Sequence, residues 1–321
     1  MLVGLLCIFL AYNFNSKNTF QVSGYAYGTT WSITSTEYIA DHHEKKIQNI
    51  INNIDMMASN YKPDSEIALI NNSPVNTDLL VSDGLFHILS IAQSISKESD
   101  GYYDITLGKT SSSMGFSPDF EKNVENNPLN RSYELNKSNQ TVNKNSLFWF
   151  DLSSIAKGYA VQRIHDYLIK NNLPNHLIDI GGEVIINGTN YSEPWKIGIQ
   201  DPNSVTSNPI YIIKNTNASF LSIATSGEYR NFKTNSLGLI DTHTINPNSL
   251  RSIKPDSLSV TVISSKSATY ADGYATAFNA MSVNKSIEIA NANDIALMLV
   301  VENGSDIELL FSDKWYDFAY E

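Results

Sequence analysis

The order in which helix-like and strand-like segments follow one another constrains the fold of this chain more than any other feature of its sequence. Strand-like segments succeed one another near 177–187 and 195–200, and two more flank Asn303-Gly304 near the end. Apolar and polar residues alternate at 195–200 and again at 258–262, as in half-buried strands. The strand-like segments do not alternate strictly with helices, as they would in a doubly wound parallel sheet. The order therefore predicts an α+β fold of antiparallel sheets with packed helices.

Four segments carry the 3.6-residue period of amphipathic helices. They span residues 38–58, the stretch that begins after Ser82, about 153–170 and about 267–282. Ser82 is a residue type that commonly caps a helix N-terminus. Each of these segments is expected to bury one apolar stripe against the sheet.

Shorter elements are expected between these helices. Residues 20–35 predict two strands around a turn at Gly28-Thr29-Thr30, and Phe148–Asp151 predict a strand that runs directly into the third helix. Residues 111–146 are rich in Asn and Ser and show no period, so they predict a loop that contains one short strand at most. Long irregular stretches in compact domains are often functional.

The first 12 residues form an apolar run, and residues 13–19 are polar. Such a run is shorter than the roughly 20 residues of a spanning helix, so residues 1–19 predict a secretion signal or membrane anchor plus linker, followed by one domain over 20–321. Cys7, the chain's one cysteine, lies inside this run, and Leu6 before it does not favour lipidation. A body without cysteine suits an oxidising compartment, and we expect a periplasmic protein associated with the inner membrane.

The charge balance excludes some functions. The net charge is −11 with 22 Lys and Arg, which does not suit a nucleic-acid-binding protein. If the ligand carries phosphates, their attraction must be local, from a metal ion or a few main-chain amides.

Two segments contain residues suited to phosphate and metal chemistry. In Asp151-Leu-Ser-Ser-Ile-Ala-Lys157, a helix is expected to begin near Ser153, and helix N-termini attract phosphate, which Lys157 can reach. Asp272 and Thr276 are four residues apart, so they share a helix face and offer hard oxygen ligands to Mg²⁺. The alternatives are that Asp151 and Ser153 are only caps and that the second helix has an ordinary solvated face.

Other candidate groups are less distinctive by themselves. His243 has a side chain that can act as acid or base near neutral pH, although most single histidines are surface or structural residues. Tyr27, Tyr61, Tyr102 and Tyr103 can stack on a flat heterocycle, or they can simply pack in the core.

Together, the ordered segments resemble the ApbE family of FAD:protein FMN transferases, once described as thiamine-biosynthesis lipoproteins. The resemblance extends from about Tyr25 to at least Met281. The segments that carry it are Asn-Tyr-Lys-Pro-Asp-Ser-Glu-Ile, Gly-Tyr-Tyr-Asp-Ile-Thr-Leu-Gly, Asp-Leu-Ser-Ser-Ile-Ala-Lys-Gly-Tyr-Ala-Val, Ile-Asp-Ile-Gly-Gly-Glu, Ile-Ala-Thr-Ser-Gly-Glu-Tyr-Arg-Asn-Phe, His-Thr-Ile-Asn-Pro and Ala-Asp-Gly-Tyr-Ala-Thr-Ala.

The resemblance implies a T-fold-like α+β architecture with FAD in a cleft between its parts. It implies Asp272, Thr276 and the main-chain carbonyl of Ser154 as Mg²⁺ ligands, and His243 as the residue that assists transfer. The positions that match the family's FAD contacts are Tyr27, Tyr61, Tyr102, Tyr103, Asp104, Asp151, Lys157 and Ile245.

The implied reaction is Mg²⁺-dependent transfer of FMN from FAD to a Thr or Ser hydroxyl of another protein, with release of AMP. The implied acceptors are subunits of the sodium-pumping NADH:quinone oxidoreductase or of Rnf-type complexes. Two alternatives stay open: a Mg²⁺-dependent FAD pyrophosphatase that gives FMN and AMP, and a flavin-binding or storage protein without turnover.

The chain departs from the family pattern at several positions. Tyr27 stands where the family usually has Met, Ser117 where it prefers Gly, Gln162 where Asp is common, and Asn246 where Asp precedes Pro247. None of these changes removes an implied metal ligand, so they bear on substrate contacts and rate more than on the type of reaction.

Overall fold

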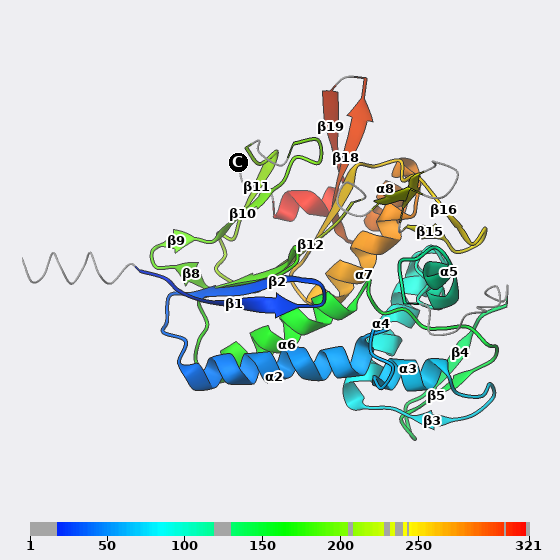
Figure 1. Cartoon of the computed structure of the whole chain (residues 1–321). Helices are drawn as coiled ribbons and strands as arrows, with labels where there is room; N and C mark the ends of the chain where they lie inside the picture. The colour runs from blue at the N-terminus through cyan, green and yellow to red at the C-terminus, as the bar shows by residue number, and fades with distance from the viewer. Residues whose placement is uncertain are drawn as a thin grey trace, which may run out of the picture.

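An eight-stranded sheet, in which every neighbouring pair of strands is antiparallel, forms the centre of the molecule (Figure 1). The computed structural model describes residues 18–118, 130–204, 208–227, 232–234, 240–242, 244–304 and 306–318. The strands lie in the order β1 (Phe20–Ala26), β2 (Thr29–Ser35), β6 (His176–Ile180), β7 (Glu183–Asn187), β12 (Leu221–Gly227), β17 (Ser259–Ser264), β18 (Ala296–Asn303) and β19 (Asp306–Phe311). The predicted α+β fold with antiparallel sheets is confirmed.

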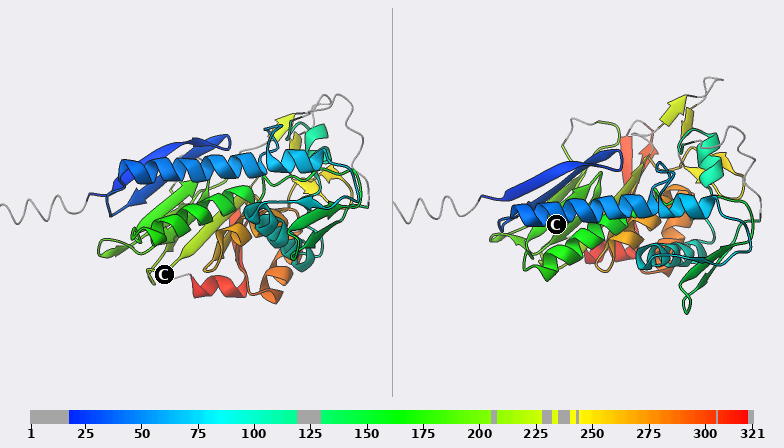
Figure 2. Two further views of the ribbon diagram at one scale, coloured as in Figure 1. Left: turned by 90° about the horizontal axis from the view of Figure 1, so that it is seen from below. Right: turned by 60° about the horizontal axis from the view of Figure 1, so that its bottom comes forward.

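Two layers of helices cover one face of this sheet. Helices α6 (Ala156–Lys170) and α7 (Ala268–Asn279) pack on the central strands, while α2 (Asp41–Ala58) and α4 (Asp83–Glu98) pack on those two helices from outside (Figures 1 and 2). The four helices fall within or close to the segments predicted for them. The predicted N-cap Ser82 accepts a hydrogen bond from the Leu85 amide at 3.3 Å, which satisfies one amide of the first turn.

The strands of the sheet bury both faces where they are central. Along β18, Leu297 and Leu299 point into the main core, and Met298 and Val300 point into a second apolar cluster on the opposite face. Strands β10 (Lys196–Ile199) and β11 (Tyr211–Lys214) and the 3₁₀ helix η2 (Asp313–Asp317) contribute to that second cluster, η2 through the buried Trp315.

Residues 111–146 contain more regular structure than the sequence indicated. Helix α5 (Gly108–Ser113) enters this stretch, and β4 (Tyr133–Asn136) and β5 (Thr141–Lys144) form a hairpin where at most one strand was expected. The remaining elements are α3 (Glu66–Asn71), α8 (Val283–Ala292), β3 (Leu79–Leu80), β8 (Thr189–Asn190), β9 (Glu193–Pro194), β13 (Phe232–Thr234), β14 (Ile240–Thr242), β15 (Ile245–Asn246) and β16 (Arg251–Ser252).

Two local predictions around residue 150 are wrong. Residues 148–151 form no strand but only an isolated bridge between Trp149 and Leu107. Helix α6 begins at Ala156 rather than near Ser153, and its N-cap Ile155 offers no side-chain cap. The Asp151 carboxylate instead accepts the Ser153 amide at 3.0 Å, so it stabilises a turn before the helix.

Among the described residues, no helix is both long and apolar enough to cross a membrane. The segment 1–17, on which the signal or anchor prediction falls, lies outside the described residues.

A pair of buried histidines links α6 to the sheet. His165 Nδ1 lies 2.9 Å from His176 Nε2, and His176 Nδ1 lies 2.7 Å from the Leu173 carbonyl oxygen. A carbonyl can only accept, so His176 donates from Nδ1, and in its neutral form its Nε2 accepts a hydrogen bond from His165 Nδ1. Protonation of His176 at Nε2 would remove this acceptor. Burial lowers the pKa of each histidine to about 4, and at His176 the bond to the Leu173 carbonyl and the nearby Glu37 carboxylate oppose this only in part.

We expect the free energy of unfolding to fall as the pH drops from about 6.5 toward 4. In that window the unfolded chain protonates both histidines and the folded chain does not, so acidification favours unfolding. One pKa unit corresponds to about 1.4 kcal/mol, which makes the loss several kcal/mol for the pair. Thermal melts between pH 7.5 and 4.5 measure this loss of stability.

Two variants test the cause. His165→Asn keeps a hydrogen-bond donor near the position of Nδ1 but does not titrate, so it should flatten the dependence of stability on pH, whereas His87→Asn, at an exposed histidine, should not. Equal slopes for all three proteins would contradict this assignment.

Candidate functional site

The helices α6 and α7 and the strand β7 bring three charged side chains together. Lys157 Nζ lies 2.5 Å from Glu183 Oε2, and the Asp272 carboxylate accepts the Gly158 amide at 2.8 Å. Glu183 and Asp272 are both about 4% exposed. Asp272 was predicted from its helix spacing, and Glu183, which ends the Ile-Asp-Ile-Gly-Gly-Glu segment, was not singled out as a site residue.

The electrostatics of this cluster are those of two acids that share one cation. Burial, and then the neighbouring Glu183, raise the pKa of Asp272 well above its ordinary value. Burial also raises the pKa of Glu183, against the attraction of Lys157. Burial opposes the charge of Lys157, but the two carboxylates outweigh it and raise the pKa of the ammonium group. A second cation would therefore be attracted to the buried acids.

Gly158 allows the two helices to meet this closely. A Cβ added at Gly158 would lie 2.4 Å from the Ala268 carbonyl oxygen and 2.6 Å from the Asp272 Cβ. The missing side chain lets α6 approach α7 until the Gly158 amide reaches the carboxylate. The glycine in the Lys-Gly-Tyr-Ala segment thus has a packing role that the sequence pattern alone did not reveal.

Two of the predicted metal ligands lie beside a predicted flavin contact. The hydroxyl groups of Tyr103 and Ser154 are 3.0 Å apart, and the Tyr103 ring approaches α7 at Gly273, next to Asp272. Thr276 lies one turn further along α7 and is half-buried. Burial raises the pKa of Tyr103 well above its ordinary value, so its hydroxyl stays protonated and can donate.

The chemistry of these donors suits a magnesium ion. A carboxylate, a hydroxyl and a main-chain carbonyl are hard oxygen ligands, which Mg²⁺ prefers, and it usually retains waters or phosphate oxygens in its other positions. No group of three or more His, Cys, Asp or Glu side chains with metal-binding geometry occurs among the described residues.

Asp151 and Tyr61 meet at the loop that follows α5. The Asp151 carboxylate accepts the Ser117 hydroxyl at 2.9 Å, and the Tyr61 hydroxyl donates to the Phe116 carbonyl at 2.8 Å. Burial, followed by the charge of Asp151, raises the pKa of Tyr61. Tyr61 as a whole residue is 66% exposed, so it offers an aromatic side chain to a ligand at this point.

Asp104 is held by an arginine that the sequence analysis did not identify. Arg131 Nη2 forms an ion pair with Asp104 Oδ2 at 2.9 Å and also donates to the Pro247 carbonyl at 3.0 Å. The other Asp104 oxygen accepts from the Thr106 amide and hydroxyl. Arg131 therefore ties a predicted flavin contact to the His-Thr-Ile-Asn-Pro segment, although nothing in the local sequence around Arg131 indicates this.

The remaining predicted site residues lie in different surroundings. The Tyr27 hydroxyl donates to the Ile51 carbonyl of α2 at 2.8 Å, so its polar end is used by the core. Tyr102 is half-buried against the main core, and Ile245 is buried in β15. Its neighbour Thr244 accepts from Asn279 of α7 at 2.8 Å, which fixes β15 to the helix that carries Asp272. His243 lies outside the described residues.

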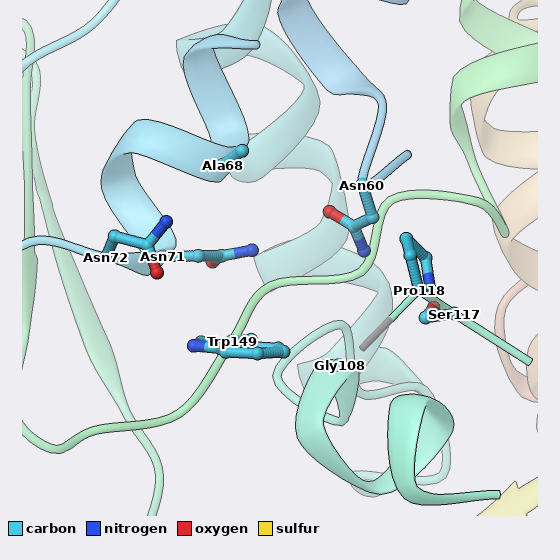
Figure 3. A pocket seen from close by; sticks show the side chains of 8 residues that line it. All are labelled: Asn60, Ala68, Asn71, Asn72, Gly108, Ser117, Pro118 and Trp149. Carbon is cyan, nitrogen blue, oxygen red and sulfur yellow. The ribbon is translucent and has the colours of Figure 1, made fainter. Parts of the chain in front are cut away.

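A small cavity lies beside Trp149 (Figure 3), and Lys157, Glu183 and Asp272 are not among the residues that line it. It offers about 20 Å³ of space to water and is lined by Asn60, Ala68, Asn71, Asn72, Gly108, Ser117, Pro118 and Trp149. That space is about enough for one water molecule. The buried Asn60 Oδ1 has no hydrogen-bond partner in the described part of the chain, which a water there would supply. The cavity is therefore too small for a flavin ring.

Comparisons with known proteins agree with the sequence resemblance. The model of the ApbE family matches residues 27–299. A protein from Haemophilus influenzae named "FAD:protein FMN transferase" is 30% identical over 88% of this chain and 87% of its own length, and one of the same name from Vibrio cholerae is 29% identical over 93% and 92%.

Solved structures show the same fold. The structure titled "Flavin Transferase ApbE from Vibrio cholerae" has a TM-score of 0.79 and 28% identity, and covers 94% of this chain and 100% of that one. The ApbE protein from Thermotoga maritima, at 24% identity, has a TM-score of 0.80 and covers 95% and 100%. The resemblance inferred from the ordered segments is confirmed.

Proposed function

The chain belongs to the ApbE family, and we propose on that premise that it is an FAD:protein FMN transferase that uses Mg²⁺ and releases AMP. Relatives at 30% and 29% identity carry the transferase name and align over most of this chain. The observation that best supports the proposal is the convergence of Lys157, Glu183 and Asp272 at the contact of α6 with α7. It provides buried acids for a cation and an ammonium group for a phosphate.

Asp272, Thr276 and the main-chain carbonyl of Ser154 would hold the ion. Once bound, Mg²⁺ would neutralise the pyrophosphate of FAD and polarise the phosphorus under attack. The chain as a whole is acidic, with a net charge of −11, so binding a pyrophosphate requires such local positive charge. Lys157 adds to it because its pKa lies above the ordinary value.

The residues of the chain then position the reacting groups. The hydroxyl oxygen of the acceptor forms a bond to the phosphorus of the FMN half, the bridging P–O bond breaks, and AMP departs with that oxygen. We assign removal of the hydroxyl proton to His243. The exposed ring of Tyr61 and the carboxylates of Asp104 and Asp151 would hold the flavin and ribityl parts of the substrate. Positioning and charge stabilisation supply most of the rate in such transfers.

The acceptor and the cellular location complete the proposal. We assign the acceptor hydroxyl to a Thr or Ser in an exposed segment of a subunit of a sodium-pumping NADH:quinone oxidoreductase or an Rnf-type complex. The apolar run at residues 1–12 and the absence of cysteine after Cys7 support a periplasmic location, with membrane association through the N-terminal segment.

Release of AMP from FAD tests the proposal. We expect AMP to appear with Mg²⁺ and an acceptor protein, to disappear with EDTA and to return when Mg²⁺ is added in excess. The acceptor should accelerate AMP release, since its hydroxyl is the intended nucleophile. AMP release at the same rate without any acceptor would instead support the FAD pyrophosphatase. FAD that binds and stays intact would support a storage protein.

A further inference from the structure

Strand β1 leaves one edge of the central sheet open (Figure 1). In β2, the Thr30 carbonyl accepts the Gly181 amide and the Thr36 amide donates to Asn175, so even-numbered residues of β2 direct their backbone groups toward β6. Each β1 residue opposite an even-numbered β2 residue therefore forms a non-hydrogen-bonded pair with it in the antiparallel ladder. These β1 residues are Gln21, Ser23 and Tyr25.

The backbone N–H and C=O groups of these three residues consequently point out of the sheet edge. All three residues are exposed, and Tyr25 is 70% exposed. Backbone groups of this kind are the template on which a further strand can pair. Within the part of the chain that the structure describes, no strand pairs with this edge.

The two edges of the sheet differ in how well they are protected. Strand β19 at the far edge carries Asp306 and Glu308, and charged side chains hinder the addition of a strand. Strand β1 reads Phe-Gln-Val-Ser-Gly-Tyr-Ala, with neither a charge nor a proline over its seven residues. Proteins usually protect such an edge, so an unprotected edge of this length is consistent with use as a binding surface.

The turn that ends β1 lies at the same end of the sheet as the candidate site. Strand β1 ends in a two-residue turn, Tyr27-Gly28, both of whose residues have positive φ, as in the tight turns of β-hairpins. Thr29, just after the turn, packs so closely on Gly181 that an added Cβ there would lie 2.6 Å from the Thr29 methyl group. Two residues after Gly181, Glu183 binds Lys157. A segment paired with β1 would thus have one end at the same end of the sheet as the charged cluster, with β1, β2 and β6 between it and Glu183.

We propose that the β1 edge binds the acceptor protein by strand addition, with an extended segment next to the modified hydroxyl paired to Gln21, Ser23 and Tyr25. This inference rests on the proposed transferase function, which requires a protein substrate. Main-chain pairing gives affinity with little dependence on the partner's side chains. It also fixes the direction of the segment, so that the modified hydroxyl would follow the paired residues at the end of the sheet that carries the candidate site.

Ser23→Pro tests the docking role. Proline removes the outward N–H of Ser23 and is tolerated at edge positions whose N–H faces solvent. We expect the KM for the acceptor to rise at least tenfold, while FAD binding and the slow hydrolysis of FAD by water stay unchanged. Ser23→Ala, which keeps the N–H, is the matched control and should behave like the wild type. The probe is the soluble domain of a flavin-carrying subunit of a sodium-pumping NADH:quinone oxidoreductase.

Hydrogen exchange on the wild-type protein provides a reading that does not depend on the variant's folding. Adding the acceptor should slow exchange of the amides at 21, 23 and 25. If the acceptor gains FMN with no protection there, or with an unchanged KM for Ser23→Pro, the docking proposal is wrong although the transferase stands. If β1 pairs with a second copy, the protein will be a dimer that Ser23→Pro dissociates, and the proposal is again wrong. If FAD is hydrolysed but the acceptor never gains FMN, the transferase function fails and the docking role with it.

Discussion

Asp272→Asn is expected to reduce AMP release from FAD by roughly 10²- to 10³-fold. The substitution keeps the shape of the side chain and an oxygen that can accept a hydrogen bond from the Gly158 amide. In the wild type this amide nitrogen lies 2.8 Å from Asp272 Oδ2. It removes the negative charge that would hold Mg²⁺. Metal-ion stabilisation of developing charge contributes several kcal/mol, and each 1.4 kcal/mol is a factor of ten in rate.

Stability measurements separate this effect from misfolding. The Asp272 carboxylate is about 4% exposed and lies beside Glu183, so its charge is unfavourable in the folded protein without a metal. We expect Asp272→Asn to melt at the same or a higher temperature than the wild type without Mg²⁺. We also expect it to lose the stabilisation that Mg²⁺ and FAD give the wild type. Asp166→Asn, at a partly exposed carboxylate of α6, is the control. Normal turnover in Asp272→Asn would remove the metal assignment.

Gly158→Ala is expected to reduce activity by at least about 10²-fold, because a displacement of 1 Å can have that effect on positioned groups. The new Cβ would lie 2.4 Å from the Ala268 carbonyl oxygen, which belongs to a helix backbone and cannot turn aside. Helices α6 and α7 must separate, and the bond from Gly158 to Asp272 must lengthen or break. Overpacking of this kind costs typically 1–3 kcal/mol, more than the roughly 1 kcal/mol that Ala gains over Gly in a helix.

Gly84→Ala is the matched control for this prediction. Gly84 also lies in a helix, but the nearest atom to its added Cβ is the Met57 Sδ at 2.8 Å, at the flexible end of a side chain. We expect Gly84→Ala to retain activity and to be as stable as the wild type or more so. If Gly158→Ala is as active as Gly84→Ala, the close approach of α6 and α7 does not position Asp272.

The sequence predicted the larger elements because their patterns are long. The stripe in α2 repeats over five turns and identifies a buried face, and Asn303-Gly304 marks the turn between the apolar run of β18 and the strand β19. The segment near Asp151 was predicted less well. Asp151 and Ser153 have the residue types of a helix cap, but tertiary contacts with Ser117 and the bridge from Trp149 to Leu107 hold that segment in another conformation.

The candidate site was predictable where neighbours in the sequence are also neighbours in space. Asp272 and Thr276 share a face because four residues make about one helical turn. Glu183 and Arg131 were not identified, because their partners Lys157 and Asp104 lie 26 and 27 residues away in the chain. Only the folded arrangement of β7 against α6, and of residue 131 against residue 104, reveals these ion pairs.

The mass of an intact acceptor protein tests the transferase most directly. The protein, FAD and Mg²⁺ are incubated with a candidate acceptor subunit, and the product is examined by mass spectrometry and by flavin fluorescence after denaturing electrophoresis. We expect the acceptor to gain the mass of one FMN joined through a phosphoester bond. Replacing the acceptor Thr by Val should abolish the gain, because the shape is kept and the nucleophile is lost. FAD consumed with equal release of FMN and AMP, and no gain of mass in any acceptor, would contradict the proposed transfer.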